Sequence, residues 1–322
     1  MKFLRYIRTG ISLTAILLLL CGAAYFPEYK IGKKTYSRLK DLIASQKLRV
    51  RKGATRIEVY DPSTEKSPMV LYKGKNYLYF NSTRIALSSP AVINKNGSLV
   101  SKMDGLKTIV PLLEKGSVYR HKVGTVVLDP GHGGKDQGAS NGRTKEKELN
   151  LSLAKRVEKY LKAQGYRVLL TRRGDTFLSL QSRPAFANAE KADLYVAIHT
   201  NSAVSKKPNG IEVFCLAPAG TASTNSSTVS WKSYAGNKND AKNIRLAYHL
   251  QRSLLVKTKA KDMGVKRARF AVLKDLKCPG ALVEIGFLSN PEEVKKLRTS
   301  EYMDKLAKGI ANGISNYCIS MR

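Results

Sequence analysis

The stretch VGTVVLDPGHGG, residues 123–134, decides the fold. Val123 to Leu128 form a continuous apolar run, which predicts a buried β-strand ending at the Asp-Pro-Gly turn that follows. Further along, short apolar strands alternate with amphipathic helical patterns as far as the C-terminus. This alternation is typical of an α/β layered domain, which we place at residues 122–322.

The domain is expected to contain four more strands and four helices. The strands are residues 167–170, 194–198, 210–216 and 281–285, and the helices are residues 147–163, 182–189, 241–258 and about 302–317. Residues 218–240 have no apolar period and are rich in Ser, Thr, Asn and Gly, which predicts a long loop.

A smaller unit precedes this domain, at residues 28–118. Its pattern predicts a helix over residues 35–44, strands over 56–60, 69–72, 76–80 and 84–87, and a short helix over 105–113 that Pro111 breaks. The unit contains no His and no Cys, so it carries no visible catalytic chemistry. We expect a small α+β domain that is a spacer, a binding module or a packing partner.

The first 24 residues have the order of a secretory signal: a basic start, an apolar run and then small residues. Lys2, Arg5 and Arg8 precede the apolar run, which ends at Ala24. The run is short for a membrane span, which needs about 20 apolar residues, and an uncleaved anchor is the alternative. Either reading predicts an exported protein of the periplasm or cell envelope.

The chain carries a large excess of positive charge. Among its 322 residues, 57 Lys and Arg stand against 24 Asp and Glu, which gives a net charge of +33. Such a surface attracts polyanions, and nucleic acid is one candidate. The export pattern and the lack of a recognised nucleic-acid-binding motif argue against it. We therefore expect no nucleic-acid partner and an anionic cell envelope instead.

The four cysteines, Cys21, Cys215, Cys278 and Cys318, include no Cys-x-x-Cys pair. This excludes a cysteine-rich zinc site and a thioredoxin-type motif. Four cysteines are also too few for a disulfide scaffold, although one disulfide stays open.

Two of the four histidines lie at or just beyond the ends of predicted strands. His132 lies in the glycine-rich turn after the first strand, and His199 ends the run that contains strand 194–198. Ligands of open α/β sheets bind beyond the carboxyl ends of the strands, so these two histidines can converge on one ion.

Two carboxylates complete this constellation. Glu146 continues the inward stripe of helix 147–163, and a buried carboxylate needs a counter-charge. Two His and one carboxylate form a common catalytic zinc set, which leaves the fourth position to water. Glu284 lies in the last strand at the same edge of the sheet, where it suits a general base.

Each of these residues also has a structural reading of its own. A lone His after a strand is most often structural, Glu146 in a first helical turn complements the helix dipole, and Glu284 suits a buried salt bridge. The presence of all four at one sheet edge favours the metal site. The remaining histidines, His121 and His249, are expected to be solvated surface residues.

Six stretches carry a family resemblance. They are VLDPGHGG (127–134) with Gly138-Ala139, EKELNL (146–151), the segment 171–188, DLYVAIHTN (193–201), GIEVF (210–214) and LVEIGFLSN (282–290). In this order they resemble zinc-dependent N-acetylmuramoyl-L-alanine amidases of the amidase-3 type. The resemblance covers about residues 122–317 and implies a twisted, mostly parallel sheet flanked by helices.

By this resemblance, His132, Glu146 and His199 bind Zn²⁺ and Glu284 is the catalytic base. The implied enzyme is a peptidoglycan hydrolase, an N-acetylmuramoyl-L-alanine amidase. It cleaves the amide between N-acetylmuramic acid and the L-alanine of the stem peptide by attack of zinc-activated water.

Arg183, Asn201 and Asn290 lie in the same motifs and are the expected substrate contacts. Peptidoglycan is the implied partner, a protein activator stays open, and we expect a monomer. Two alternatives to the amidase remain. One is another zinc-dependent cell-wall hydrolase, a deacetylase or carboxypeptidase, and the other is an inactive wall-binding protein.

Residues 28–118 resemble a second family. YLYFN (77–81) through LSSP (87–90), and VSKMD (100–104) through IVPL (109–112), are similar to the copper amine oxidase N-terminal-like module, which accompanies envelope enzymes. The resemblance implies no copper, because the stretch lacks copper ligands. Our hypothesis is that this unit docks the enzyme on the cell wall.

The long loop differs from some relatives, which carry an inhibitory helix in an insertion at this place. Residues 218–240 have no apolar helical stripe, so we expect no autoinhibition of that type. Trp231 or Tyr234 is either a sugar-stacking residue or part of a mobile surface loop.

Overall fold

The computed structural model describes residues 27–322, except residues 225 and 227. The predicted export signal or anchor, residues 1–24, lies outside the described residues. Within the described part, no helix combines the length and the apolar character that crossing a membrane requires.

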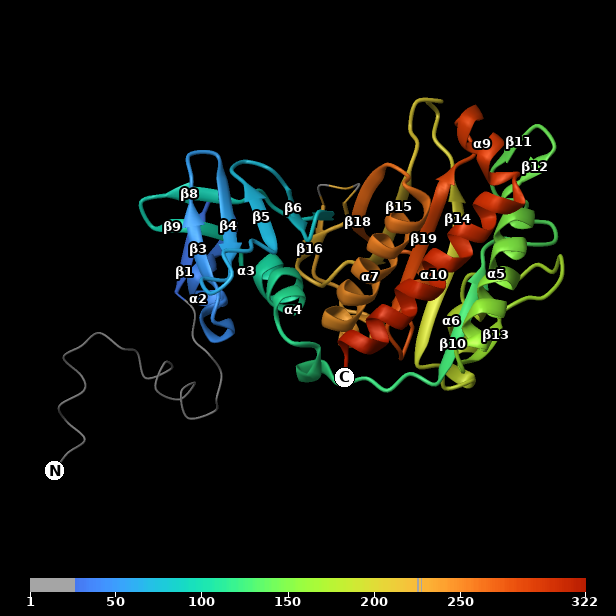
Figure 1. The fold of residues 1–322 in the computed structure, drawn as a ribbon, viewed down its shortest axis with the longest axis horizontal. Coiled ribbons are helices and arrows are strands. Elements are labelled where there is room, and N and C mark those ends of the chain that lie inside the picture. Colours follow the sequence, from blue (N-terminus) through green and yellow to red (C-terminus); the bar gives the residue numbers. More distant parts are fainter. Residues whose placement is uncertain (1–26, 225, 227) are drawn as a thin grey trace.

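One mixed sheet of eleven strands runs through the molecule (Figure 1). Its strand order is β13 (Arg167–Leu170), β10 (Thr125–Pro130), β14 (Leu194–Asn201), β19 (Gly280–Phe287), β15 (Ile211–Leu216), β18 (Asp262–Ala268), β7 (Thr83–Ala86), β6 (Tyr77–Phe80), β5 (Met69–Tyr72), β4 (Arg56–Tyr60) and β3 (Arg49–Lys52). The strands β13, β10, β14 and β19 are parallel, and β15 is antiparallel to β19. The strand β18 is parallel to both of its neighbours, and β7 to β3 form an antiparallel meander.

Helices cover both faces of the C-terminal part of this sheet. The long helices α5 (Glu146–Ala163), α7 (Asp240–Thr258) and α10 (Ser300–Ser320) lie on the face seen in Figure 1. They share a core with Val126 and Leu128, whereas Val127 packs on the opposite face with α6 (Ser182–Ala189) and α8 (Ala271–Lys274). The alternation along β10 thus supplies both layers, and the predicted α/β class is confirmed.

The remaining elements are short. They are α9 (Pro291–Leu297), the hairpin β11 (Ser140–Asn141) and β12 (Thr144–Lys145), the hairpin β16 (Thr221–Ala222) and β17 (Val229–Ser230), and the 3-10 turns η2 (Ala44–Gln46), η4 (Gly116–Tyr119) and η5 (Ala235–Asn239). The last hairpin and η5 lie within residues 218–240, where the described residues before α7 form no α-helix.

The predicted elements of residues 122–322 are all present, and their ends shift by at most three residues. The strand β18 is not predicted, because Asp262, Lys266 and Arg267 interrupt its apolar pattern. In the structure each charge has a partner. The Asp262 carboxylate accepts from the Arg84 amide at 2.8 Å, Lys266 pairs with Glu212, and Arg267 pairs with Asp104.

The N-terminal part adds a second sheet and its own helices. The sheet has the order β1 (Glu28–Ile31), β2 (Lys34–Arg38), β9 (Gly97–Ser101) and β8 (Val92–Asn94). The helical segments are α2 (Leu39–Leu42), α3 (Lys102–Asp104), η3 (Gly105–Ile109) and α4 (Val110–Leu113).

Two expectations for this part need correction. The predicted helix over residues 35–44 is wrong in its first half, because residues 34–38 pair as β2 with β1 and β9 and only Leu39–Leu42 are helical. The helix at 105–113 begins earlier, at Lys102, and Pro111 does not break it. Pro111 lies in the first turn of α4, where a missing amide proton is tolerated.

The two parts of the chain share the large sheet. β7 joins β18 through the pairing of Ile85 with Val265. Beside this join, Arg267 Nη1 lies 3.2 Å from Asp104 Oδ1, and both side chains are buried. The division into units at residues 28–118 and 122–322 stays a prediction about folding units, to which the structure adds this common sheet.

Among the described residues, Cys215, Cys278 and Cys318 are free, buried thiols. Burial raises the pKa of the Cys215 thiol to about 11 and that of Cys278 to about 12. These cysteines are therefore protonated core residues at neutral pH.

Candidate metal centre

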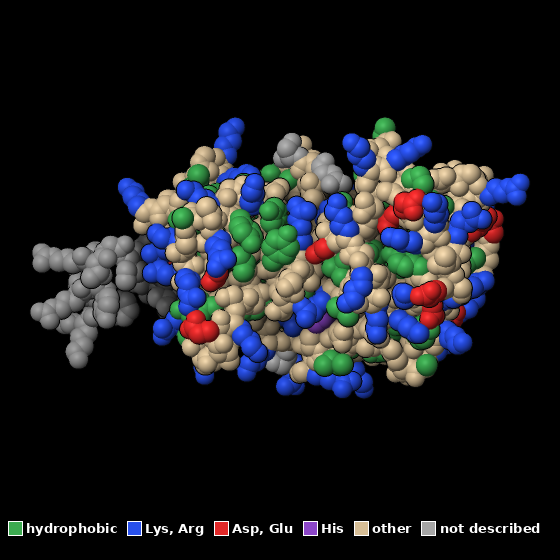
Figure 2. All heavy atoms as spheres, turned by 45° about the horizontal axis from the view of Figure 1, so that its top comes forward, with side chains coloured by type: hydrophobic (Ala, Val, Ile, Leu, Met, Phe, Trp, Pro, Cys, Tyr) green, Lys and Arg blue, Asp and Glu red, His purple; other side chains and the backbone are tan. Residues whose placement is uncertain are grey.

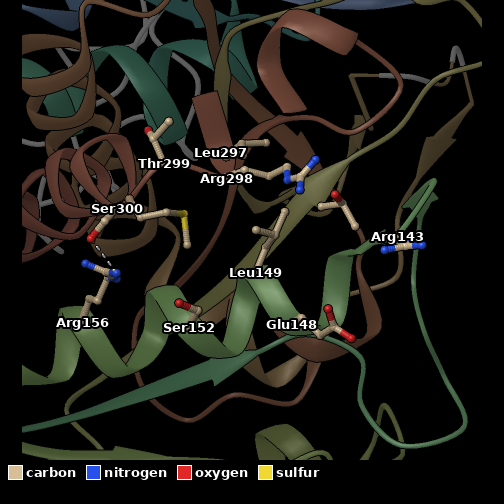
Figure 3. A pocket seen from close by; sticks show the side chains of 11 residues that line it. Arg143, Glu148, Leu149, Ser152, Arg156, Leu297, Arg298, Thr299 and Ser300 are labelled. Carbon is tan, nitrogen blue, oxygen red and sulfur yellow. Dashed lines mark hydrogen bonds between the residues drawn. The ribbon is translucent and has the colours of Figure 1, made fainter. Parts of the chain in front are cut away.

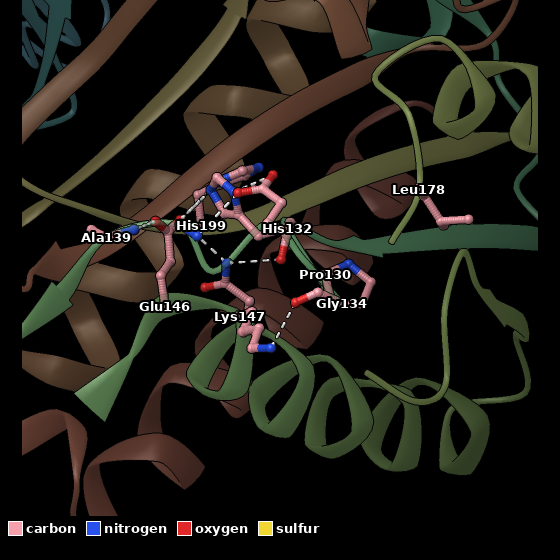
Figure 4. Close-up of polar contacts among 12 residues, drawn as sticks. Pro130, His132, Gly134, Ala139, Glu146, Lys147, Leu178 and His199 are labelled. Carbon is pink, nitrogen blue, oxygen red and sulfur yellow. Dashed lines mark hydrogen bonds and ion pairs between the residues drawn. The ribbon is translucent and has the colours of Figure 1, made fainter. Parts of the chain in front are cut away.

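Three predicted ligands converge at one edge of the sheet (Figure 4). His132 follows β10, Glu146 begins α5, and His199 lies on β14. One nitrogen or oxygen atom from each lies within 4.8 Å of the others. The structure thus brings together residues that are up to 67 positions apart in the sequence.

Glycines let the ligand loop approach the neighbouring side chains closely. A Cβ atom at Gly131 would lie 2.2 Å from His199 Cε1, so there is no room for a side chain at this position. At Gly138, where φ is +65°, a Cβ atom would lie 2.6 Å from Glu146 Oε2. His132 itself has φ +62°, a conformation that costs energy outside glycine and that the loop must hold in place.

Two buried arginines hold that loop. Arg172 donates to the carbonyl oxygens of Pro130 and Gly131, both at 2.9 Å. Arg183 donates to Asp129 Oδ1 at 2.7 Å and to the His132 carbonyl at 3.0 Å.

Arg183 was an expected substrate contact, and such a contact stays a prediction, to which the structure adds the residue's burial. The residue is only 2% exposed, and its guanidinium hydrogen bonds are made to the protein. It is a positioning residue of the ligand loop. Sequence reasoning assigned no role to Arg172, which follows β13, the neighbour of β10 in the sheet.

Glu146 is the centre of the cluster. Its Oε1 atom lies 3.1 Å from His132 Nε2 and 3.0 Å from His199 Nδ1, and the residue is 5% exposed. The Thr200 amide donates to the same oxygen at 3.1 Å, and the Ala139 amide donates to Oε2 at 2.9 Å. Burial alone would raise the pKa of Glu146, but the two histidines outweigh it and hold that pKa well below its ordinary value.

Asp136 orients the first histidine. Its Oδ2 atom lies 2.9 Å from His132 Nδ1, which leaves Nε2 facing Glu146. A carboxylate that fixes the ring of a ligating histidine is common around metal sites. Sequence reasoning missed Asp136, although a carboxylate four residues after the histidine in a glycine-rich loop could have suggested it.

Glu284 lies beside the cluster on the next strand. The register places it opposite His199 of β14 on one side and opposite Glu212 of β15 on the other. Its Oε2 atom is buried and has no hydrogen-bond partner among the described residues. Burial, followed by the negative charges of Glu146 and Glu212, raises the pKa of Glu284 well above its ordinary value.

Glu212 is a further buried acid that sequence reasoning missed. It is 3% exposed, pairs with Lys266 and accepts a hydrogen bond from Asn201 Nδ2 at 2.8 Å. The strand around it is otherwise apolar and fully buried, and this lone acid was the signal that could have found it. Its position opposite Glu284 follows only from the pairing of β15 with β19.

The other expected substrate contacts have structural partners. Asn201 donates a hydrogen bond to Glu212. Asn290 is the N-cap of α9 and accepts hydrogen bonds from the amides of Glu292 and Glu293 at 3.0 and 3.2 Å. Contact of Asn201 and Asn290 with substrate stays a prediction.

His121 and His249 are not the solvated residues that the sequence suggested. His121 Nδ1 lies 2.9 Å from the Tyr317 hydroxyl, and His249 is half-buried between helices α7 and α10. Burial, together with Arg245 and Arg252, lowers the pKa of His249 to about 4. The error arose because Arg245, which shares its helix face, is itself buried.

Two surface features lie away from the metal cluster. Trp231 is 78% exposed and comes after the C-terminal end of β15. Glu212, which lies beside the cluster, is at the opposite end of the same strand. A pocket of about 350 Å³ lies between α5 and the α9–α10 region and is bordered by Arg143, Glu148 and Arg156 (Figure 3). It contains none of the cluster residues.

Comparison with known proteins agrees with the resemblance to the amidase-3 family. Residues 126–316 match the family model Amidase_3, described as N-acetylmuramoyl-L-alanine amidase. The N-acetylmuramoyl-L-alanine amidase LytC of Bacillus subtilis is 38% identical over 193 residues, which are 60% of this chain and 35% of LytC. The chain thus spans about a third of that relative's length.

Solved structures agree with the sequence match. The catalytic domain of the amidase CwlV from Bacillus (Paenibacillus) polymyxa var. colistinus has a TM-score of 0.52 and 32% identity, over 60% of this chain and 97% of that domain. The CwlD amidase from Clostridioides difficile, in complex with the GerS lipoprotein, has a TM-score of 0.51 and 28% identity, over 60% and 98%.

Proposed function

Because the chain belongs to the amidase-3 family of N-acetylmuramoyl-L-alanine amidases, we propose that it is a metal-dependent peptidoglycan hydrolase. Its reaction would be hydrolysis of the amide between N-acetylmuramic acid and the L-alanine of the stem peptide. The observation that carries this proposal is the His132–Glu146–His199 cluster beside Glu284, whose Oε2 has no hydrogen-bond partner in the described part of the chain.

The donor set fits zinc. Two imidazole nitrogens and one carboxylate oxygen are a usual catalytic zinc set. In this structure both imidazole rings contact the same Glu146 oxygen, and a bound cation would replace these contacts. A zinc ion held by these three side chains supplies Lewis-acid chemistry, which lowers the pKa of water and polarises an amide carbonyl.

Glu284 supplies the proton transfers. Among the residues described, none bonds its Oε2, so this oxygen can accept a proton from the attacking water, and the side chain can then donate that proton to the leaving amine nitrogen. Its neighbour Glu212 is engaged by Lys266 and Asn201. Of these two neighbouring buried acids, Glu284 is therefore the better proton carrier.

The setting of the enzyme belongs to the same proposal. The export pattern of residues 1–24 and the basic surface support action at the cell envelope, on peptidoglycan. The CwlD neighbour was solved with a lipoprotein partner, which supports a protein partner for this chain as well. A monomeric state stays a prediction.

A soluble substrate tests the reaction. The purified chain with zinc should release free L-alanyl-D-isoglutamine from N-acetylmuramoyl-L-alanyl-D-isoglutamine, and a chelator should stop the release. Mass spectrometry identifies the products. Release of acetate with the amide intact would support the deacetylase alternative, and no reaction on this substrate or on polymeric peptidoglycan would favour the inactive wall-binding protein.

A further inference from the structure

The N-terminal strands carry a cluster of partly exposed tyrosines on their outer side. Tyr72 of β5 and Tyr77 and Tyr79 of β6 contact one another, with ring centroids between 5.8 and 6.3 Å apart. The guanidinium carbon of Arg84, on β7, lies 4.5 Å from the centre of the Tyr77 ring. The residues that alternate with these four are buried in the core, so the four point away from it. We call Tyr72, Tyr77, Tyr79 and Arg84 the tyrosine face.

The tyrosine face lies on the same side of the same sheet as the metal centre. Residues opposite one another on neighbouring strands point to the same side. One cross-strand row runs in order through His199, Glu284, Glu212, Gly264, Arg84 and Tyr79. The metal ligand at one end and the tyrosines at the other are thus connected by the strand register.

The distance along this row suits a polymer. Tyr79 lies four strands from Glu284, which corresponds to about 19 Å at ~4.8 Å per strand. The twist of the sheet also turns the tyrosine face relative to the metal centre. A small molecule at one place cannot touch the other, whereas an extended chain can.

Charge and side-chain chemistry define the ligand. Residues 28–118 contain 18 Lys and Arg against 7 Asp and Glu, and Figure 2 shows basic side chains around hydrophobic ones over these strands. Tyrosine rings offer a flat apolar surface and a hydroxyl, which suit the apolar faces and the hydroxyl groups of sugar rings. Arg84 and its basic surroundings suit carboxylates, which stem peptides carry.

We propose that the tyrosine face binds the glycan strand of peptidoglycan, next to the point at which the metal centre cleaves its stem-peptide amide. The proposal rests on the proposed function, since it extends the binding of the same substrate. A lipid surface or nucleic acid would match the charge equally well, but the row that leads to the amidase centre favours the glycan.

Binding to insoluble peptidoglycan tests this directly. The full chain carrying Tyr77→Ala and Tyr79→Ala should sediment with purified sacculi at least about tenfold more weakly than the parent, because large aromatic anchors dominate binding surfaces. The double variant Tyr77→Phe and Tyr79→Phe keeps the rings and should bind within a fewfold of the parent. Tyr29→Ala is the matched control, since Tyr29 also faces an arginine, Arg38, but on the other sheet.

Turnover separates this proposal from the proposed function. The Tyr-to-Ala double variant should raise KM for polymeric peptidoglycan and leave hydrolysis of the muramoyl dipeptide and the melting temperature unchanged. Sedimentation needs no turnover, so it reports on the tyrosine face even if the chain is not an amidase. Unchanged sedimentation of a folded double variant would overturn the proposal. So would an equal loss of binding to anionic vesicles or DNA, because the face would then be a general polyanion surface.

Discussion

Glu284 and His199 are opposite each other on neighbouring strands, yet the account gives them different roles. Glu284→Gln should keep the metal and lower kcat by about 10²–10⁴, because only the proton acceptor is lost. His199→Ala should lose both the metal and the activity. Metal analysis of the purified variants, together with turnover on the muramoyl dipeptide, measures both effects. Loss of the metal from Glu284→Gln would instead place Glu284 in the ligand set.

The buried His249 should make the free energy of unfolding depend on pH. Burial, together with the positive charges of Arg245 and Arg252, lowers its native pKa to about 4, while the unfolded chain takes up the proton near pH 6.5. The unfolded state therefore binds more protons between these values, and the free energy of unfolding should fall by up to about 3 kcal/mol as the pH drops from 6.5 to 4. Below pH 4 this contribution should change no further.

Urea unfolding of the metal-free chain and of His249→Gln at pH 7 and pH 4.5 isolates this contribution. The other titrating groups are common to both proteins, so their difference reports His249. The parent should lose more stability than the variant on acidification. Equal losses would show that the imidazole is protonated in the native state.

At the scale of elements, β18 connects the two parts of the large sheet through charged residues. Arg267→Met should lower the free energy of unfolding by about 3 kcal/mol, because it leaves Asp104 buried without its cation. Lys305→Met is the control, since its pair with Glu301 is exposed and such pairs contribute less than about 1 kcal/mol. Chemical denaturation of both variants measures the difference. A loss at Arg267 no larger than at Lys305 would mean that the join does not depend on this pair.

The same element shows where sequence reasoning reaches its limit. Strands such as β10 and β14 are apolar on both faces, so their pattern alone predicts them and the ligands at their ends. The strand β18 is polar because its partners, Glu212 and Asp104, come from distant parts of the chain. Only the assembled sheet shows that its charges are paired.

Residues 34–38 illustrate a related limit in the N-terminal part. The stripe of Leu39, Leu42 and Ile43 predicts a helix, but the residues before it pair with two neighbouring strands, which overrides the local preference. The predicted metal ligands were easier to identify, because His132 and His199 lie near the carboxyl ends of apolar strands and Glu146 begins a helix. The burial of Arg183 could not be predicted, because it depends on the loop that the residue supports.

Across the whole molecule, one sheet connects the edge that carries the candidate metal centre with a basic, tyrosine-bearing N-terminal part. Residues 126–316 match the amidase family, and the N-terminal strands lie outside that match. The basic surface of the full chain suits an anionic polymer. This arrangement is consistent with an enzyme that acts on a solid, polymeric substrate.

The proposed reaction is cleavage of the bond between muramic acid and L-alanine with a metal held by His132, Glu146 and His199. The most direct measurement is mass spectrometry of purified peptidoglycan after digestion by residues 25–322, with zinc and with a chelator. We expect zinc-dependent release of stem peptides that begin with a free L-alanine, while the glycan strands stay intact. Release of acetate, of terminal D-alanine or of glycan fragments in place of these peptides would contradict it.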